Sequence, residues 1–134
     1  MSVVLDTNVL IWLFERRPDL GPQAIERIDE ALRSSRVMMS AASIWQVGIL
    51  ASKNRIKLNQ PIDQWRIELL RLGVEEVPID GELAFDSVAL LEIHPHPALR
   101  FIAATALRVQ ATLVTSDARL LAWKGPLACI DARV

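Results

Sequence analysis

The chain has 134 residues, the length of a single domain, and its 15 Lys and Arg residues nearly balance 16 Asp and Glu residues. A composition of 51% hydrophobic and 23% charged residues is typical of a folded globular protein and excludes an intrinsically disordered one. The single cysteine, Cys129, excludes an internal disulfide framework. The net charge of -1 does not exclude nucleic-acid binding, because a chain that is nearly neutral as a whole can still carry a local basic stripe.

The N-terminal residues lack the features of a targeting or membrane segment. They carry no basic region, and Asp6 interrupts the first apolar stretch. The next apolar run, 9–14, is far shorter than the about 20 residues of a transmembrane helix. We therefore expect one cytoplasmic domain over residues 1–134 with no membrane association.

The first half of the sequence alternates short apolar runs with helical patterns. A buried strand is expected at 2–5 and a second at 37–40, where Ser40 or Ser43 can cap the helix that follows. The helices of this half are expected at 9–14, 20–33, 42–54 and 61–72.

The second half continues the same alternation. The sequence His94-Pro95-His96-Pro97 cannot be helical throughout and predicts a loop. Strands are expected at 74–79, 111–115 and 127–130, and helices at 82–91, 98–109 and 118–123. Strands that alternate with helices predict an α/β fold with a mostly parallel sheet covered on both faces.

Two acidic residues follow predicted strands. Asp6 comes directly after the first strand, and Asp117 comes after the strand at 111–115. Ligand sites of open α/β sheets lie beyond the carboxyl ends of strands, so both carboxylates can face one crevice. Helix N-capping is the alternative, because Asp is a favoured N-cap residue.

Four ordered segments form a pattern: VVLDTN at 3–8, SAASIWQV at 40–47, RFIAATA at 100–106 and ATLVTSD at 111–117. Together they resemble the PIN-domain family, and most closely the VapC-type toxins of bacterial toxin–antitoxin pairs. The resemblance implies a PIN-like three-layer α/β/α sandwich and a Mg²⁺- or Mn²⁺-dependent endoribonuclease. It also implies a homodimer that acts on RNA and is neutralised by a small antitoxin protein.

The resemblance carries over only part of the family's acidic site. Asp6 and Asp117 match the first and last acids, whereas Gln46 and Leu99 stand where two others are expected, and His96 replaces a further common Asp. No Asp or Glu occurs in 37–62 or in 93–116, so no neighbouring residue can substitute.

These changes predict a weakened cation site and weak catalysis. Gln46 offers only a neutral oxygen to a hard cation, and Leu99 offers no ligand atom. His96 can join Asp6 and Asp117 as a third ligand for Mn²⁺, Ni²⁺ or Zn²⁺. The alternative for His94 and His96 is an exposed loop, stiffened by proline, with no ligand role.

Polar neighbours of the two acids are expected to support them. By resemblance, Asn8 and either Thr115 or Ser116 orient the carboxylates through hydrogen bonds, and helix capping or turn formation is the alternative role. Arg100 is expected either to face the phosphate backbone or to pair with Asp117 or Asp6.

A basic stretch follows the second block of the resemblance. Lys53, Arg55 and Lys57 would attract phosphates if they lay at the pocket rim, and the alternative is a solvated basic face.

The four tryptophans give a prediction about the surface. Trp12 and Trp45 lie in apolar helical patterns that indicate core positions, whereas Trp65 and Trp123 are candidates for an exposed patch that contacts a partner.

The sequence therefore supports two hypotheses. One is a toxin-like endoribonuclease that uses Asp6 and Asp117 as catalytic and metal-binding residues with reduced efficiency. The other is a catalytically inactive PIN domain that binds an antitoxin or RNA.

Overall fold

A five-stranded parallel sheet, with strand order β3-β2-β1-β4-β5, forms the centre of the computed structural model, which describes residues 1–134. The strands are β1 (Val3–Leu5), β2 (Val37–Ser40), β3 (Val74–Val77), β4 (Thr112–Thr115) and β5 (Cys129–Asp131). The helices are α1 (Thr7–Phe14), α2 (Pro22–Ser34), α3 (Ala41–Ser52), α4 (Ile62–Arg71), α5 (Gly81–Val88), α6 (Pro97–Arg108) and α7 (Ala118–Ala122). The α/β class and the parallel sheet are confirmed.

Every predicted helix and strand is present, and the differences lie at the ends. The helix expected at 9–14 begins at Thr7, and the one expected at 82–91 ends at Val88. No helix is both long enough and apolar enough to cross a bilayer.

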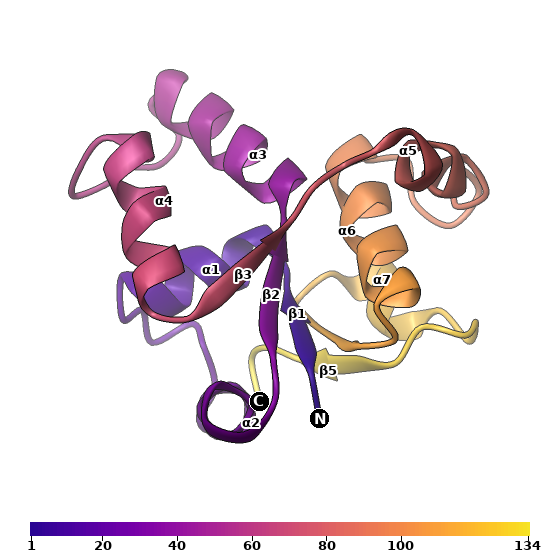
Figure 1. The fold of residues 1–134 in the computed structure, drawn as a ribbon, viewed down its shortest axis with the longest axis horizontal. Helices are drawn as coiled ribbons and strands as arrows, with labels where there is room; N and C mark the ends of the chain where they lie inside the picture. Colours follow the sequence, from indigo (N-terminus) through magenta and orange to yellow (C-terminus); the bar gives the residue numbers. More distant parts are fainter.

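Helices cover both faces of the sheet and make three layers (Figure 1). Side chains alternate along β1, so Val3 and Leu5 enter one buried apolar cluster and Val4 enters the other. The first cluster includes residues of α1, α2, α3 and α4, and the second includes residues of α5, α6 and α7. This arrangement matches the predicted α/β/α sandwich.

The order of the strands creates a crevice between β1 and β4. From β1 the chain runs outward through β2 to β3, and it then returns to the other side of β1 as β4. Ligands bind at such a reversal, beyond the carboxyl ends of the strands. Asp6 directly follows β1 and Asp117 closely follows β4, so the fold brings the two acids to this crevice.

Two of the tryptophan predictions are wrong. Trp65 is fully buried and contacts Phe14 edge to face, with ring centroids 5.8 Å apart. Trp45 is 58% exposed, because Ser43 and Val47 occupy the buried face of α3 and Trp45 lies on its other side. Trp12 and Trp123 are half-buried at the edges of the two apolar clusters.

Substitutions near the end of α4 test this packing. Leu69 is fully buried in the first apolar cluster, whereas Leu72 is 55% exposed. Leu69→Ala is expected to lower the free energy of unfolding by about 2–5 kcal/mol, and Leu72→Ala by no more than about 0.5 kcal/mol. Urea denaturation measures both, and equal losses would contradict the packing described here.

Candidate functional site

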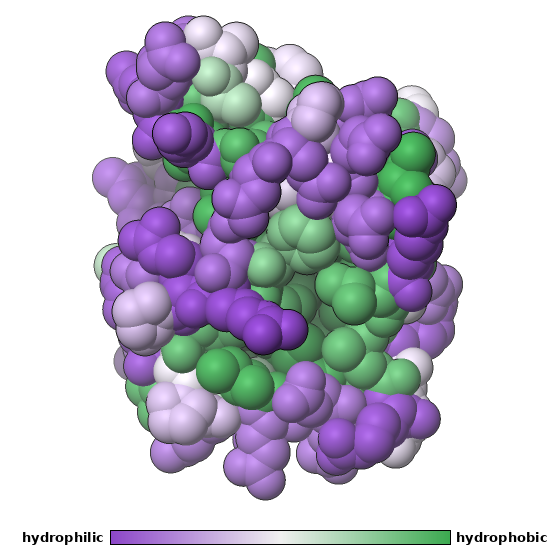
Figure 2. Space-filling view, turned by 90° about the vertical axis from the view of Figure 1, so that its left-hand side faces the viewer, coloured by the Kyte–Doolittle hydropathy of each residue, from purple (hydrophilic) through white to green (hydrophobic).

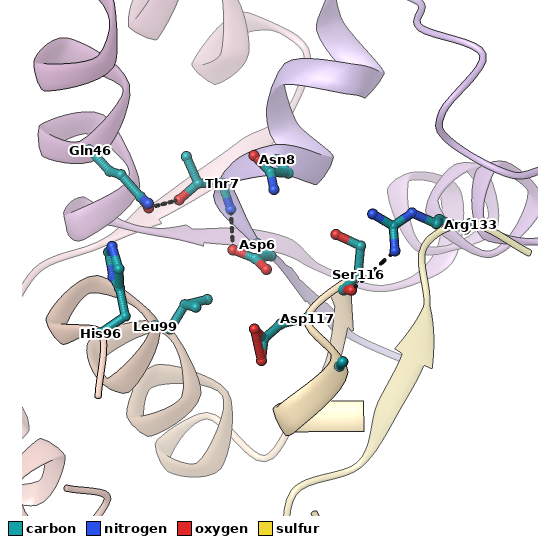
Figure 3. A pocket seen from close by; sticks show the side chains of 10 residues that line it. Asp6, Thr7, Asn8, Gln46, His96, Leu99, Ser116, Asp117 and Arg133 are labelled. Atoms are coloured by element: carbon teal, nitrogen blue, oxygen red, sulfur yellow. Dashed lines mark hydrogen bonds between the residues drawn. The ribbon is translucent and has the colours of Figure 1, made fainter. Parts of the chain in front are cut away.

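A pocket of about 290 Å³ opens at the carboxyl ends of β1 and β4 (Figure 3). Polar side chains dominate its wall, and both candidate acids belong to it. The lining residues are Asp6, Thr7, Asn8, Gln46, His96, Leu99, Ser116, Asp117, Ala118 and Arg133.

Asp6 is fixed in the pocket by its backbone and by both carboxylate oxygens. Its N–H donates to the Val114 carbonyl at 3.1 Å, which continues the pairing of β1 with β4. Its Oδ1 accepts the Thr7 N–H and its Oδ2 accepts the Thr115 hydroxyl, each at 2.6 Å. Burial raises the pKa of this carboxyl, the Thr115 and Thr7 hydrogen bonds oppose that rise, and the nearby charge of Asp117 adds to it.

Thr115 joins the two acids. Its buried hydroxyl donates to Asp6 Oδ2 and accepts the backbone N–H of Asp117 at 3.0 Å. These are the hydrogen bonds that the predicted orienting role of Thr115 requires, and the role itself stays a prediction. Asn8 and Ser116 line the pocket without a side-chain hydrogen bond to either acid, so their support of a bound ligand stays a prediction.

Asp117 is both a pocket acid and a helix cap. Its Oδ2 accepts the Leu120 N–H at 3.0 Å and caps α7, while Oδ1 lies 3.0 Å from His94 Nε2. The two alternatives drawn from the sequence for this residue are compatible, because one carboxylate oxygen caps the helix and the other lies beside the histidine.

His94 departs from the expectation of an exposed loop. It is only 8% exposed, and its Nδ1 accepts the His96 N–H at 3.0 Å. A nitrogen that accepts carries no proton, so in the neutral ring the proton is on Nε2 and is donated to Asp117. Sequence reasoning missed this partner because nothing in the loop distinguishes His94 from His96.

Arg100 pairs with neither acid, and its role facing the phosphate backbone of a substrate stays a prediction. One of its guanidinium nitrogens, Nη1, donates to the His94 carbonyl at 2.9 Å and to the Pro95 carbonyl at 2.8 Å. The prediction that it pairs with Asp117 or Asp6 is wrong, because the proline-rich loop folds back over the start of α6 and supplies nearer acceptors.

The three substituted positions lie in the same pocket as the two acids. Gln46 Oε1 accepts the Thr7 hydroxyl at 2.6 Å, and Leu99 and His96 come from the start of α6 and its cap. Figure 3 shows Gln46 and His96 on one side of Asp6 and Arg133 on the other. The structure thus brings Asp6 and Asp117 together with the three side chains that stand where the resemblance expects acids.

The pocket fits a cation site with few protein ligands. No group of three or more His, Cys, Asp and Glu side chains lies close enough to hold a metal ion, so His96 as a third ligand stays a prediction. Two carboxylates nevertheless suit Mg²⁺, which usually binds one or two of them and completes its shell with water and substrate phosphate. Neutral oxygens of Asn8 and Gln46 line the same space.

The basic stretch after α3 is not part of this pocket. Lys53, Arg55 and Lys57 are exposed, and none of them lines it. The pocket's cation is Arg133, which the sequence analysis did not single out. Its position depends on the pairing of β5 with β4, which no local pattern around residue 133 reveals.

Thr115 gives a direct test of the hydrogen bonds around the acids. Thr115→Val keeps the shape but removes the hydroxyl, which leaves Asp6 Oδ2 and the Asp117 N–H without this partner. The free energy of unfolding is expected to fall by about 1–3 kcal/mol, because buried polar groups become unsatisfied. Thr115→Ser keeps the hydroxyl and is expected to lose less in urea denaturation. A larger loss for Ser than for Val would refute this role.

Comparisons with known proteins agree with this fold and site. The family model described as the PIN domain matches residues 3–124. Ribonuclease VapC22 of Mycobacterium tuberculosis is 34% identical over 129 residues, which are 93% of this chain and 94% of the relative. The structure of VapBC-1 from nontypeable Haemophilus influenzae matches with a TM-score of 0.64 at 25% identity over 98% of both chains. VapBC2 from Rickettsia felis, bound to a DNA fragment from its promoter, matches with a TM-score of 0.69 at 17% identity over 97% of this chain and 98% of the other. The chain belongs to the PIN-domain family and is VapC-like.

Proposed function

We propose that this protein is a VapC-type toxin that cleaves RNA with low efficiency and is controlled by a small antitoxin. The observation that carries the proposal is the pocket between β1 and β4, where Asp6 and Asp117 lie together. The 34% identity to a ribonuclease of the VapC type supports the same activity.

Asp6 and Asp117 are the residues that would hold Mg²⁺ or Mn²⁺, with His96 as a further ligand that suits Mn²⁺. Such a cation supplies an activated water and stabilises negative charge on the phosphate that is attacked. Gln46 and Leu99 add no charge, so we propose that the protein alone binds the cation weakly and that a phosphate of the RNA completes the ligand set.

A second candidate is a PIN domain without nuclease activity that binds an antitoxin or RNA. One observation favours it: each of the four carboxylate oxygens of Asp6 and Asp117 has a hydrogen-bond partner. The two acids are therefore satisfied without a cation. Each oxygen still keeps a second lone pair, so the hydrogen bonds leave room for metal binding.

We also propose a homodimer and an antitoxin complex in the cytoplasm. The exposed apolar surface supports both. Phe85 is 77% exposed and lines an apolar groove with Val88 and Leu107, between α5 and α6. Figure 2 shows a hollowed apolar area on another face of the molecule. Leu13 and Ile25 line a further pocket, which apolar and polar residues share equally. Apolar patches of this kind mark interaction surfaces.

A thermal-shift titration with Mn²⁺, Mg²⁺ and chelator tests the cation site. A ligand that binds only the folded state stabilises it by about 2.7 kcal/mol at a hundredfold excess over its dissociation constant. We expect Mn²⁺ to raise the Tm of the unmodified protein and of Asp63→Asn, an exposed control on α4, but not that of Asp6→Asn.

RNA cleavage then separates the two candidates. A toxin of this kind should cut single-stranded RNA in Mn²⁺ at high protein concentration, and Asp6→Asn should not. If the unmodified protein cuts no RNA while keeping an antitoxin or RNA partner, the inactive binding domain is the correct function. If Mn²⁺ raised the Tm of Asp6→Asn as much as that of the unmodified protein, the cation would bind somewhere other than this pocket.

A further inference from the structure

The segment that follows β5 is held tightly against the pocket. The Ala132 N–H donates to the Thr115 carbonyl at 2.9 Å, and the Ala132 carbonyl accepts the Gly21 N–H at 2.8 Å. A side chain at residue 21 would place its Cβ 2.5 Å from the carbonyl carbon and oxygen of Arg133. Gly21 therefore permits the close approach of its backbone to that of Arg133, whose side chain lines the pocket.

The side chain of Arg133 is directed by two further contacts. Its guanidinium carbon lies 5.8 Å from the centre of the Trp12 ring, within the range of a cation–π interaction. One of its nitrogens donates to the Ser116 carbonyl at 3.4 Å, at the edge of the pocket (Figure 3). The Trp12 ring and the Ser116 carbonyl thus hold the guanidinium of Arg133 at the edge of the pocket.

Arg133 also keeps most of its hydrogen-bonding capacity. No carboxylate forms an ion pair with it, whereas Arg66 and Arg36 each bind a glutamate through two nitrogens. A guanidinium has five N–H donors, and only one of those of Arg133 has an acceptor. The unused donors can bind the oxygens of a phosphate in the planar, two-pronged way that arginine favours.

Arg133 offsets the negative charge of the pocket. Asp6 and Asp117 would repel an approaching phosphodiester, and Arg133 is the only Lys or Arg side chain in the lining. We propose that Arg133 is a substrate-binding residue that holds a phosphate of the RNA chain beside the two acids. The inference rests on the proposed function, because it assigns the backbone of the same RNA substrate to a residue of the same pocket.

Binding of a fluorescein-labelled single-stranded RNA, measured by anisotropy without divalent ions at several salt concentrations, tests the proposal. The logarithm of the binding constant falls against the logarithm of salt concentration by about 0.7 per phosphate neutralised on a single strand. Arg133→Gln is expected to weaken binding and to reduce this slope by about that amount. Arg133→Lys keeps the charge and is expected to restore most of the slope.

Arg33→Gln is the matched control, because Arg33 is exposed in the last turn of α2 and does not line the pocket. It is expected to leave both affinity and slope unchanged, and the Tm of each variant reports on folding. If the unmodified protein binds RNA and Arg133→Gln keeps the same slope, the role of Arg133 is overturned while RNA binding stands. If the unmodified protein binds no RNA in this assay, the role of Arg133 is overturned, whereas the proposed nuclease is decided separately by RNA cleavage in Mn²⁺.

Discussion

The parallel pairing of β1 with β4 is the constraint on which the site depends. It brings Asp6 next to Thr115, 109 residues away in the chain, and the Thr115 hydroxyl then joins the Asp6 carboxylate to the backbone of Asp117. Because β1–β4 is also where the strand order reverses, the two acids meet where an open α/β sheet forms its ligand crevice. The hydrogen bonds that fix the fold at this edge therefore also fix the candidate site.

Local patterns predicted the order of the helices and strands, because short buried apolar runs alternate with longer helical patterns and many elements are bounded by polar caps. The same patterns failed on α3, where apolar residues surround most of the helix and cannot show which side faces the core, so Trp45 was misplaced. Asp6 and Asp117 could be found because a short polar turn follows a buried strand. His94 and Arg133 could not, because each owes its place to tertiary contacts.

The number of acids in the pocket determines its electrostatic balance. Two carboxylates about 4 Å apart repel by about 4 kcal/mol at an effective dielectric constant of 20, so a site with more acids depends more strongly on a cation. This pocket holds two acids, each with both oxygens hydrogen-bonded, and Arg133 supplies a positive charge from the other side of the pocket. Hydrogen bonds therefore satisfy both carboxylates, and the same pocket presents the guanidinium of Arg133.

Adding acids at positions 46 and 99 tests most directly the proposal that the neutral residues there weaken the cation site. Calorimetric titration with Mn²⁺ would compare the unmodified protein with Gln46→Glu/Leu99→Asp, and with Gln46→Glu/Leu99→Asn as a control that adds one charge fewer. The account predicts binding at least tenfold tighter for the double-acid variant, about 1.4 kcal/mol, with the control between the two. Equal affinity for all three proteins would contradict it.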